Sequence, residues 1–365
     1  PRNPLSDSNA ILMTINSDLG LLGNDDINSV WIQKLHDLLS GGWKLVLHVT
    51  LDHNVGRTIK IIGNIEKLLM TGNLSVYYKR SNDSVSDTEL CIIPGTGVLQ
   101  GISTKIKNQA DCAFRYFSQT SILAFTDRFF QILNSAKPLL RSYRSQKYPE
   151  FQQAFAEAEE APGEKCVFKG GLSTITIPLV LYEKYLDQSG VSEQEFSYRS
   201  YLHRRRLDAF KEQVAHYPVR DICFIESVKD LVYKRKYSFS EDYLIQNYKP
   251  QNDDIVCHLK YLVSLLETYE NYQLAFMSKS DLEYTNSTNW MVKNNTCALI
   301  ETIPKCVTDN SRTQMNFSIT ETSVVNAFHD YFNILWDSVS DRNKNKENTV
   351  LWLKSMIEKC GRLPK

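Results

Sequence analysis

The sequence lacks an apolar stretch long enough to cross a membrane, and its start, Pro1-Arg2-Asn3-Pro4, lacks the charged-then-apolar pattern of a signal peptide. It also lacks an excess of either charge, because 42 Lys and Arg residues balance 42 Asp and Glu residues. A protein that binds nucleic acid over a broad surface needs a large positive excess. We therefore expect a cytoplasmic protein that contacts neither membranes nor, by a broad surface, DNA. The missing initiator Met indicates processing or a fragment.

Paired cysteines are missing as well. The eight cysteines are scattered without a CxxC pair or the spacing of a zinc site, and several lie in apolar runs such as Leu90-Cys91-Ile92-Ile93. This pattern is typical of small buried side chains in a reducing compartment. It predicts neither a disulfide scaffold nor a metal site.

The sequence contains no GxSxG, HExxH or EF-hand motif. Gly95-Thr96-Gly97 lacks the third glycine and the following helix of a phosphate-binding loop, so we interpret it as a turn. We expect no cofactor and no enzymatic activity. With 42% hydrophobic and 23% charged residues, the chain is nevertheless an ordinary globular protein.

An internal duplication is the most informative feature that is present. Residues 120–133 match residues 323–336, and the apolar positions of both segments follow the spacing i, i+3, i+7, i+10, i+11 of one helix face. Phe114 and Tyr116 match Phe317 and Ile319 in an alternating, strand-like pattern. Further upstream, residues 90–93 resemble 297–300, and 43–47 resemble 272–276, each of the latter two runs after an amphipathic helix.

The duplication predicts an α/β fold of two pseudo-repeated halves with a largely helical insert. We expect the first half at 1–137, the insert at 138–252, the second half at 253–340, and a tail with a last helix at 341–365. Within the insert we predict helices at 148–160, 193–216 and 222–233 and a strand at 174–181.

Short motifs resemble the C-terminal region of Firmicutes transcriptional regulators that carry an Xre-type helix-turn-helix. These motifs are His48-Val49-Thr50-Leu51-Asp52, Met70-Thr71-Gly72 followed by Tyr77-Tyr78, Ile93-Pro94-Gly95-Thr96, and the segment 265–272. His53 stands where that family leads us to expect an Arg, and Arg57 follows later. The resemblance implies a ligand-sensing region whose DNA-binding domain is absent from this chain.

A more distant resemblance is to the phospholipase D-like fold, which also pairs two α/β halves. Its chemistry needs an HxK motif with an Asp five residues after the Lys in both halves. The one HxK here is His258-Leu259-Lys260, with Leu265 in the place of the Asp and a helix predicted around it. The resemblance therefore implies a catalytically degenerate version of the fold.

Polar residues that follow the first predicted strand of each half are our candidates for a ligand pocket, because ligands bind beyond the carboxyl ends of strands. They are His48, Asp52, His53 and Arg57 in the first half and Ser278, Lys279 and Asp281 in the second. Their opposite charges would suit a zwitterionic or anionic molecule, and one of Tyr77 and Tyr78 would line the same cleft.

Arg204, Arg205 and Arg206 form the strongest basic cluster, either a contact patch for phosphates or a partner, or a solvated helix face balanced by nearby glutamates. The function that we expect is a non-catalytic effector region, a homodimer that binds a small-molecule effector and reaches DNA only through the absent domain. The alternatives are an enzyme with an unrecognised site between the halves, with His48 and Asp52 as acid and base, and a protein-interaction scaffold.

Overall fold

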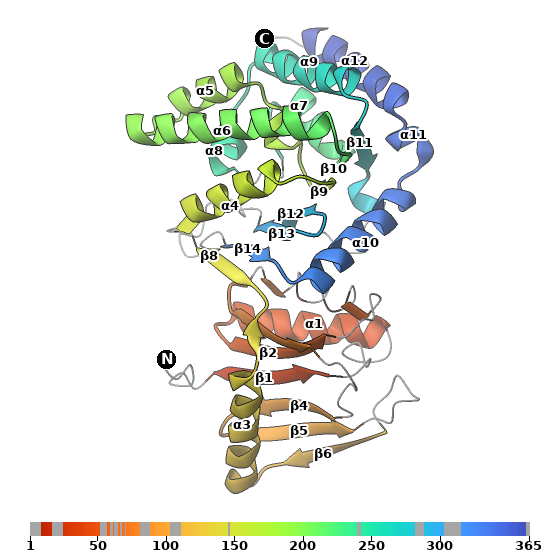
Figure 1. Ribbon diagram of the computed structural model, residues 1–365. Coiled ribbons are helices and arrows are strands. Elements are labelled where there is room, and N and C mark those ends of the chain that lie inside the picture. Colours follow the sequence, from red (N-terminus) through yellow and green to blue (C-terminus); the bar gives the residue numbers. More distant parts are fainter. Residues whose placement is uncertain are drawn as a thin grey trace. The chain divides into compact units, whose positions relative to one another are not determined.

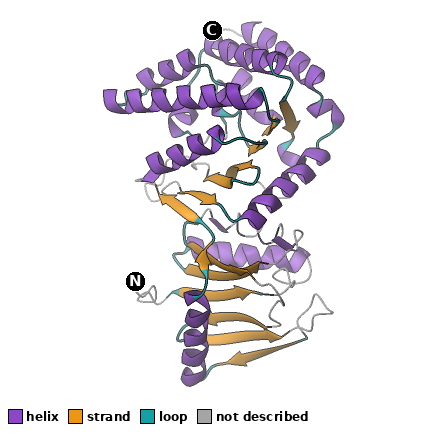
Figure 2. Ribbon diagram, in the orientation of Figure 1, coloured by secondary structure: helices purple, strands orange, loops and turns teal. Residues whose placement is uncertain are grey.

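A computed structural model describes residues 9–16, 25–51, 57–58, 61, 65, 68–69, 71–80, 88–102, 111–144, 147–238, 242–281, 288–302 and 315–362. The chain forms two compact units, Pro1–Arg141 and Ser142–Lys365. Each unit contains one mixed β-sheet covered by helices (Figures 1 and 2). None of the helices within the described ranges is long and apolar enough to span a membrane.

The first sheet has the strand order β6-β5-β4-β1-β2-β3-β7. Strands β1, β2 and β3 are parallel, and β4, β5 and β6 continue the sheet as an antiparallel meander. The strands are β1 (Ala10–Ile15), β2 (Lys44–Leu51), β3 (Leu74–Arg80), β4 (Thr88–Ile93), β5 (Gly97–Ile102), β6 (Cys112–Tyr116) and β7 (Lys137–Pro138). Every second residue is buried at positions 45–51 of β2 and 90–92 of β4, which places one face of each strand in the core.

The second sheet has the order β11-β10-β9-β12-β13-β14-β8, which repeats the topology of β1 to β6 and carries its seventh strand, β8, at the opposite edge from β7. Strands β9, β10 and β11 are parallel, and β12, β13 and β14 form the antiparallel meander. The strands are β8 (Arg141–Arg144), β9 (Lys165–Lys169), β10 (Val219–Phe224), β11 (Tyr272–Met277), β12 (Thr288–Lys293), β13 (Cys297–Thr302) and β14 (Met315–Ile319). The predicted fold of two repeated α/β halves is confirmed.

Two details make the repeat specific. The hairpins β4–β5 and β12–β13 turn through Gly95 and Asn295, which both have the positive φ that glycine and asparagine tolerate best. The amides that follow β1 and β9 each donate to a side chain on the neighbouring strand: Asn16 N to Glu89 Oε1 at 2.7 Å, and Gly170 N to Asn289 Oδ1 at 2.8 Å. We call each of these hydrogen bonds a strand pin.

Helices cover both faces of each sheet. In the first unit α3 (Gln119–Asn134) packs on β1, β4 and β5 through Ile122 and Phe129. In the second unit α10 (Thr322–Ser338) packs through Phe328 and Phe332 on the fully buried Trp290 of β12. The opposite face of that sheet carries α4 (Tyr148–Glu160), anchored by Phe151 and Phe155.

The remaining helices surround these layers. They are α1 (Asp25–Ser40) in the first unit and, in the second unit, α5 (Leu179–Gln188), α6 (Glu193–Val214), α7 (Ile225–Lys234), α8 (Tyr243–Asn247), α9 (Asn252–Thr268), α11 (Asp341–Lys344) and α12 (Lys346–Arg362), with the 3₁₀ turns η2 (Thr174–Thr176) and η3 (Lys279–Asp281). The largest core joins α5, α6, α7, α9 and α12 to β10 and β11.

Several expected details differ in the structure. The run 43–47 lies in β2, which corresponds to β10 and not to the run 272–276 in β11, and 90–93 lies in β4, which corresponds to β12. Strands β8, β9 and β10 lie in the segment that we expected as an insert, and β9 and β10 belong to the middle of the second sheet. Residues 174–181, expected as a strand, form η2 and the start of α5.

Candidate functional site

Polar side chains gather at the carboxyl ends of β1 and β2 in the first unit. Thr50 Oγ1 donates to Asn16 Oδ1 at 2.7 Å, and Thr14 Oγ1 donates to Glu89 Oε2 at 3.0 Å. The buried Arg57 guanidinium donates to the main-chain oxygens of Thr50 and Ile15. Arg57 therefore satisfies carbonyl groups at the strand ends and does not present an open charge.

Three other predicted residues of the first unit lie on β2 and β3. His48 is buried and in register with Tyr77, so their side chains share one face, whereas Tyr78 points to the other face. Neither ring nitrogen of His48 has a hydrogen-bond partner among the described residues. Burial, with a contribution from Lys79, lowers its pKa to about 4. Asp52 and His53 lie outside the described residues.

We expect that His48→Ile leaves the first unit as stable as before at about pH 7, or raises its stability by about 1 kcal/mol, because no hydrogen bond is lost. The repeat places Ile222 at the corresponding position of β10. Since the unfolded chain binds a proton at His48 below about pH 6.5 and the folded chain only near pH 4, the original unit loses stability as the pH falls between these values.

The variant should lack the loss of stability that protonation of His48 causes. Hydrogen exchange of the β1–β3 amides, compared near pH 7 and near pH 5, measures the stability of the first unit at each pH. A clear destabilisation near pH 7 would mean that His48 has an important partner.

Ser278, Lys279 and Asp281 form a turn of their own in the second unit. Ser278 Oγ donates to Glu226 Oε1 at 3.0 Å, the Lys279 amide donates to Glu226 Oε2 at 3.1 Å, and the Ser278 amide donates to Asp281 Oδ2 at 3.1 Å. The carboxylates of Glu226 and Asp281 thus tie η3 to the start of α7.

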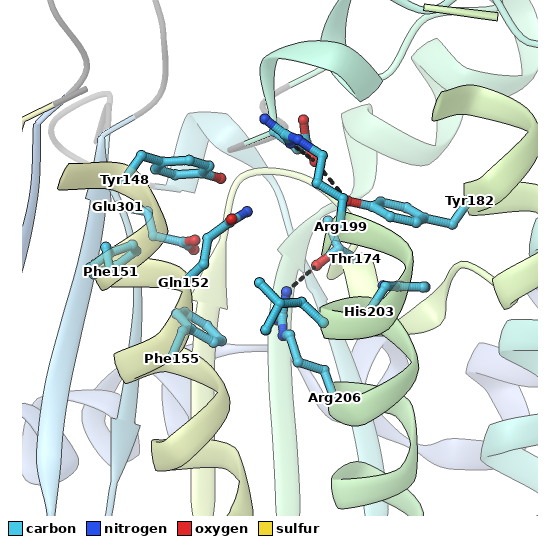
Figure 3. A pocket seen from close by; sticks show the side chains of 12 residues that line it. Tyr148, Phe151, Gln152, Phe155, Thr174, Tyr182, Arg199, His203, Arg206 and Glu301 are labelled. Carbon is cyan, nitrogen blue, oxygen red and sulfur yellow. Dashed lines mark hydrogen bonds and ion pairs between the residues drawn. The ribbon is translucent and has the colours of Figure 1, made fainter. Parts of the chain in front are cut away.

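A pocket between α4 and α6 of the second unit is the best candidate site (Figure 3). The two helices turn one stripe of side chains each toward the other: Tyr148, Phe151, Gln152 and Phe155 from α4, and Arg199, Leu202, His203 and Arg206 from α6. Thr174, Tyr182, Asp242 and Glu301 complete the lining. The cavity inside the pocket measures about 30 Å³, which is room for an ordered water molecule. The whole hollow, including the part that opens to solvent, measures about 500 Å³.

A row of buried polar side chains crosses the sheet beside this pocket. The register of β9, β12, β13 and β14 places four of them next to one another: Lys169, Asn289, Glu301 and Asn316. Lys169 Nζ lies 3.0 Å from Glu301 Oε2, and both side chains are buried. A sheet face under a helix is normally apolar, so a polar row in this place is unusual.

Buried ion pairs surround the pocket. Glu159 Oε2 lies 2.6 Å from Arg206 Nε, and Glu159 Oε1 lies 3.2 Å from Lys165 Nζ. Burial alone would raise the pKa of Glu159, but the two cations and their hydrogen bonds outweigh it and lower that pKa to about 2. Arg199 pairs with Glu195 on the same helix and with the buried Asp242 at 3.6 Å.

The arginine cluster predicted from the sequence is divided by the structure. Arg206 lines the pocket, Arg205 pairs with Glu160 outside it, and the exposed Arg204 lies 3.7 Å from Glu183. The partners are not the glutamates close in sequence that we considered. The three guanidinium groups therefore point to different partners and do not form one continuous basic patch.

His258 of the HxK motif is a structural residue. It is fully buried on α9, its Nε2 lies 2.8 Å from Thr176 Oγ1, and its Nδ1 lies 3.1 Å from the Tyr237 hydroxyl. Burial lowers its pKa to about 3, so it stays neutral.

Comparisons with known proteins find only distant structural similarity. No family model and no curated protein matches the chain. The chain is similar to the solved structure of TrmBL2, an archaeal chromatin protein, with a TM-score of 0.30, 9% identity and 61% of each chain covered. It is similar to Nuc, a phospholipase D family member from Salmonella typhimurium, with a TM-score of 0.30 and 8% identity over 56% of this chain and 97% of Nuc. It is also similar to phosphatidylserine synthase from Haemophilus influenzae, with a TM-score of 0.33 and 9% identity over 97% of this chain and 88% of the synthase.

The comparisons bear on three predictions. Our prediction that the chain has no enzymatic activity is corrected, because the similar structures include a synthase, which is an enzyme, and the fold gives no ground for excluding catalysis. The phospholipase D-like resemblance has a counterpart in Nuc. The resemblance to transcriptional regulators gains no support and remains a likeness of short motifs.

Proposed function

We propose that the protein is an enzyme whose active site is the α4–α6 pocket of the second unit. Arg199 and Arg206 hold an anionic group of a small substrate, and His203 accepts a proton. The observation that carries the proposal is that two arginines and a neutral histidine line one pocket from a single helix stripe.

The two arginines are held in place by more than their ion pairs. The guanidinium of Arg206 lies 4.5 Å from the ring centre of Phe155, and that of Arg199 lies 6.0 Å from that of Tyr148. Guanidinium groups fixed on aromatic faces are oriented before a ligand arrives, which lowers the entropy cost of binding. Buried ion pairs seldom stabilise a fold more than apolar residues do, so function is a good reason for keeping them.

His203 is suited to accept a proton. Its Nε2 lies 2.9 Å from the carbonyl oxygen of Ile177, an acceptor, so the proton of the neutral ring sits on Nε2 and leaves Nδ1 as an acceptor. Burial lowers the pKa of His203 to about 4. An anion bound between the arginines would raise that pKa toward neutrality, which makes the residue a better base when the substrate is present.

The carboxylates of Asp242 and Glu301 line the same pocket, so the site offers acceptors as well as cations. This combination suits a small molecule that carries an anionic group and an amino or hydroxyl group. Such a molecule displaces the water that the cavity has room for and enters from the solvent-open side.

The experiment begins with thermal shift measurements on the full chain with phosphoethanolamine, O-phosphoserine and free amino acids, followed by turnover of chromogenic amides and esters of the compounds that bind. We expect Arg206→Lys to weaken binding about tenfold, because Lys keeps the charge but loses the two-pronged donor. His203→Asn should lower kcat about 100-fold or more with a smaller change in KM.

Arg205→Lys is the matched control, because Arg205 directly precedes Arg206 on α6 but does not line the pocket. Its partners Glu160 and Gln153 lie on α4 and do not line the pocket either. This variant should change neither the binding affinity nor kcat. Binding without turnover would overturn the enzymatic part of the proposal, and failure of every compound to bind would overturn it altogether.

A further inference from the structure

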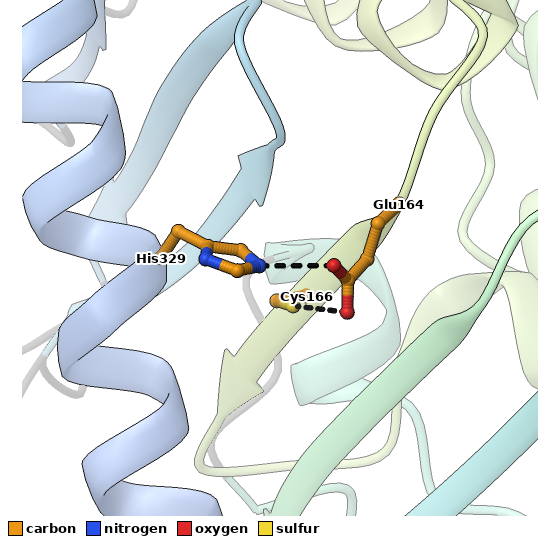
Figure 4. Close-up of side chains that lie close together, drawn as sticks. All are labelled: Glu164, Cys166 and His329. Atoms are coloured by element: carbon orange, nitrogen blue, oxygen red, sulfur yellow. Dashed lines mark hydrogen bonds and ion pairs between the residues drawn. The ribbon is translucent and has the colours of Figure 1, made fainter.

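A carboxylate, a thiol and an imidazole meet on the other face of the second sheet (Figure 4). One ligand atom from each of Glu164, Cys166 and His329 lies within 4.8 Å of the other two. His329 Nε2 lies 3.0 Å from Glu164 Oε2, and the Cys166 thiol lies 3.7 Å from Glu164 Oε1. This group could not be recognised in the sequence, because His329 is more than 160 residues from the other two.

Local structure explains why the three side chains converge. Glu164 directly precedes β9 and Cys166 is the second residue of that strand, so both point to one face. That face is covered by α10, which supplies His329 from its middle. The cysteine is buried, while Glu164 and His329 keep about a fifth of their side-chain surface exposed, which leaves a path for an ion from solvent.

We propose that Glu164, Cys166 and His329 bind a zinc ion. Zinc is held by cysteine, histidine and carboxylate ligands in tetrahedral geometry, and its bond lengths place neighbouring ligand atoms about 3.3–3.6 Å apart. His329 Nε2 and Glu164 Oε2, 3.0 Å apart, must separate by a few tenths of an ångström, and the Cys166 thiol, which lies 3.7 Å from the other carboxylate oxygen, must turn toward Oε2. Three protein ligands leave one position of the tetrahedron for water or a small ligand.

The neighbouring Arg220 fits an outer-shell role. Its Nη2 donates to Glu164 Oε1 at 2.7 Å and to Asn333 Oδ1 at 2.7 Å, and its guanidinium lies over Phe332. Glu164 binds zinc through Oε2 and keeps Oε1 for Arg220. Outer-shell partners of this kind orient metal ligands. Zinc binding releases the thiol proton to solvent, so the affinity rises with pH.

The test uses the full chain after treatment with a chelator. We expect one zinc ion per chain after addition of zinc chloride and desalting, measured by elemental mass spectrometry. Cobalt chloride should give the absorption of a cobalt–thiolate bond, which an ion pair without metal does not give. Cys166→Ser and His329→Asn should each weaken zinc binding about 100-fold or more, since even outer-shell partners contribute 10- to 100-fold.

Cys223→Ser is the matched control, because Cys223 is equally buried but belongs to the other face of the neighbouring strand β10. It should keep the zinc and the cobalt–thiolate absorption. A chain that retains no metal, or a cobalt spectrum unchanged in Cys166→Ser, would overturn the proposal. Since the cluster lies across the sheet from the α4–α6 pocket, either result leaves the proposed active site to its own test.

Discussion

Glu159→Gln is expected to lower the free energy of unfolding of the second unit by about 3–5 kcal/mol, the usual cost of removing one partner from a buried ion pair. Glu159 is 3% exposed and neutralises both Lys165 and Arg206. The substitution keeps the size of the side chain but leaves the buried Lys165 and the partly exposed Arg206 without their carboxylate. Urea unfolding followed by hydrogen exchange of the β9 and α6 amides measures the loss in the second unit alone.

The neighbouring residue supplies the control. Glu160 pairs with Arg205, the residue before Arg206, and its side chain is 41% exposed, against 2% for Glu159. Glu160→Gln should cost less than about 1 kcal/mol, as exposed ion pairs do. Equal losses for the two variants would show that burial does not set the strength of these pairs.

The same carboxylate contributes to acid sensitivity. The pKa of Glu159 is about 2 in the folded chain and near 4.5 when exposed, so its stabilising effect is complete above about pH 4.5 and is lost as the pH falls toward 2. This part of the acid unfolding should disappear in Glu159→Gln.

The second large effect is expected for Asn289→Ala, which removes one strand pin. The Gly170 amide is buried and loses its acceptor, which costs about 1–3 kcal/mol, and the truncated side chain leaves a gap in the polar row, so we expect a total of about 2–4 kcal/mol. Hydrogen exchange should rise for β9 and β12.

Glu89→Ala removes the corresponding strand pin of the first unit and should raise exchange in β1 and β4 instead. Asn247→Ala, on an exposed residue at the end of α8, should change neither unit. If Asn289→Ala affected β1 and β4 as strongly as β9, the two pins would not be local features of their own units.

Helices with a clean amphipathic period were predictable. The segments 120–133 and 323–336 lie in α3 and α10, and the helix predicted at 148–160 coincides with α4. In these segments the apolar face alone decides the structure, because it packs on a sheet. The matched pair β6 and β14 was also aligned correctly, since it directly precedes those helices.

The central strands of the second sheet were harder to predict for a physical reason. β9 begins and ends with Lys165 and Lys169, and β10 contains Arg220 and Asp221, although most of these side chains are buried. A hydropathy pattern places such charges in solvent. Their partners, such as Glu159 and Glu301, are known only once the chain is folded. For this reason the predicted match between the halves paired β2 with β11 instead of β10, and β4 with β13 instead of β12.

The α4–α6 pocket was missed for the same reason. Glu159 and Arg206 are 47 residues apart, and nothing in a single sequence pairs them. One available signal was Pro178, which stands at the N-cap of α5 and disfavours the strand expected at 174–181.

The passage from one sheet to the other is short, which determines where the chain can be divided. β7 ends at Pro138 and β8 begins at Arg141, so Leu139 and Leu140 alone separate a strand of the first sheet from a strand of the second. If the chain were cut between Leu139 and Leu140, each of the two fragments would keep every described strand of its own sheet. The two leucines are therefore the point at which the chain passes from one α/β module to the other.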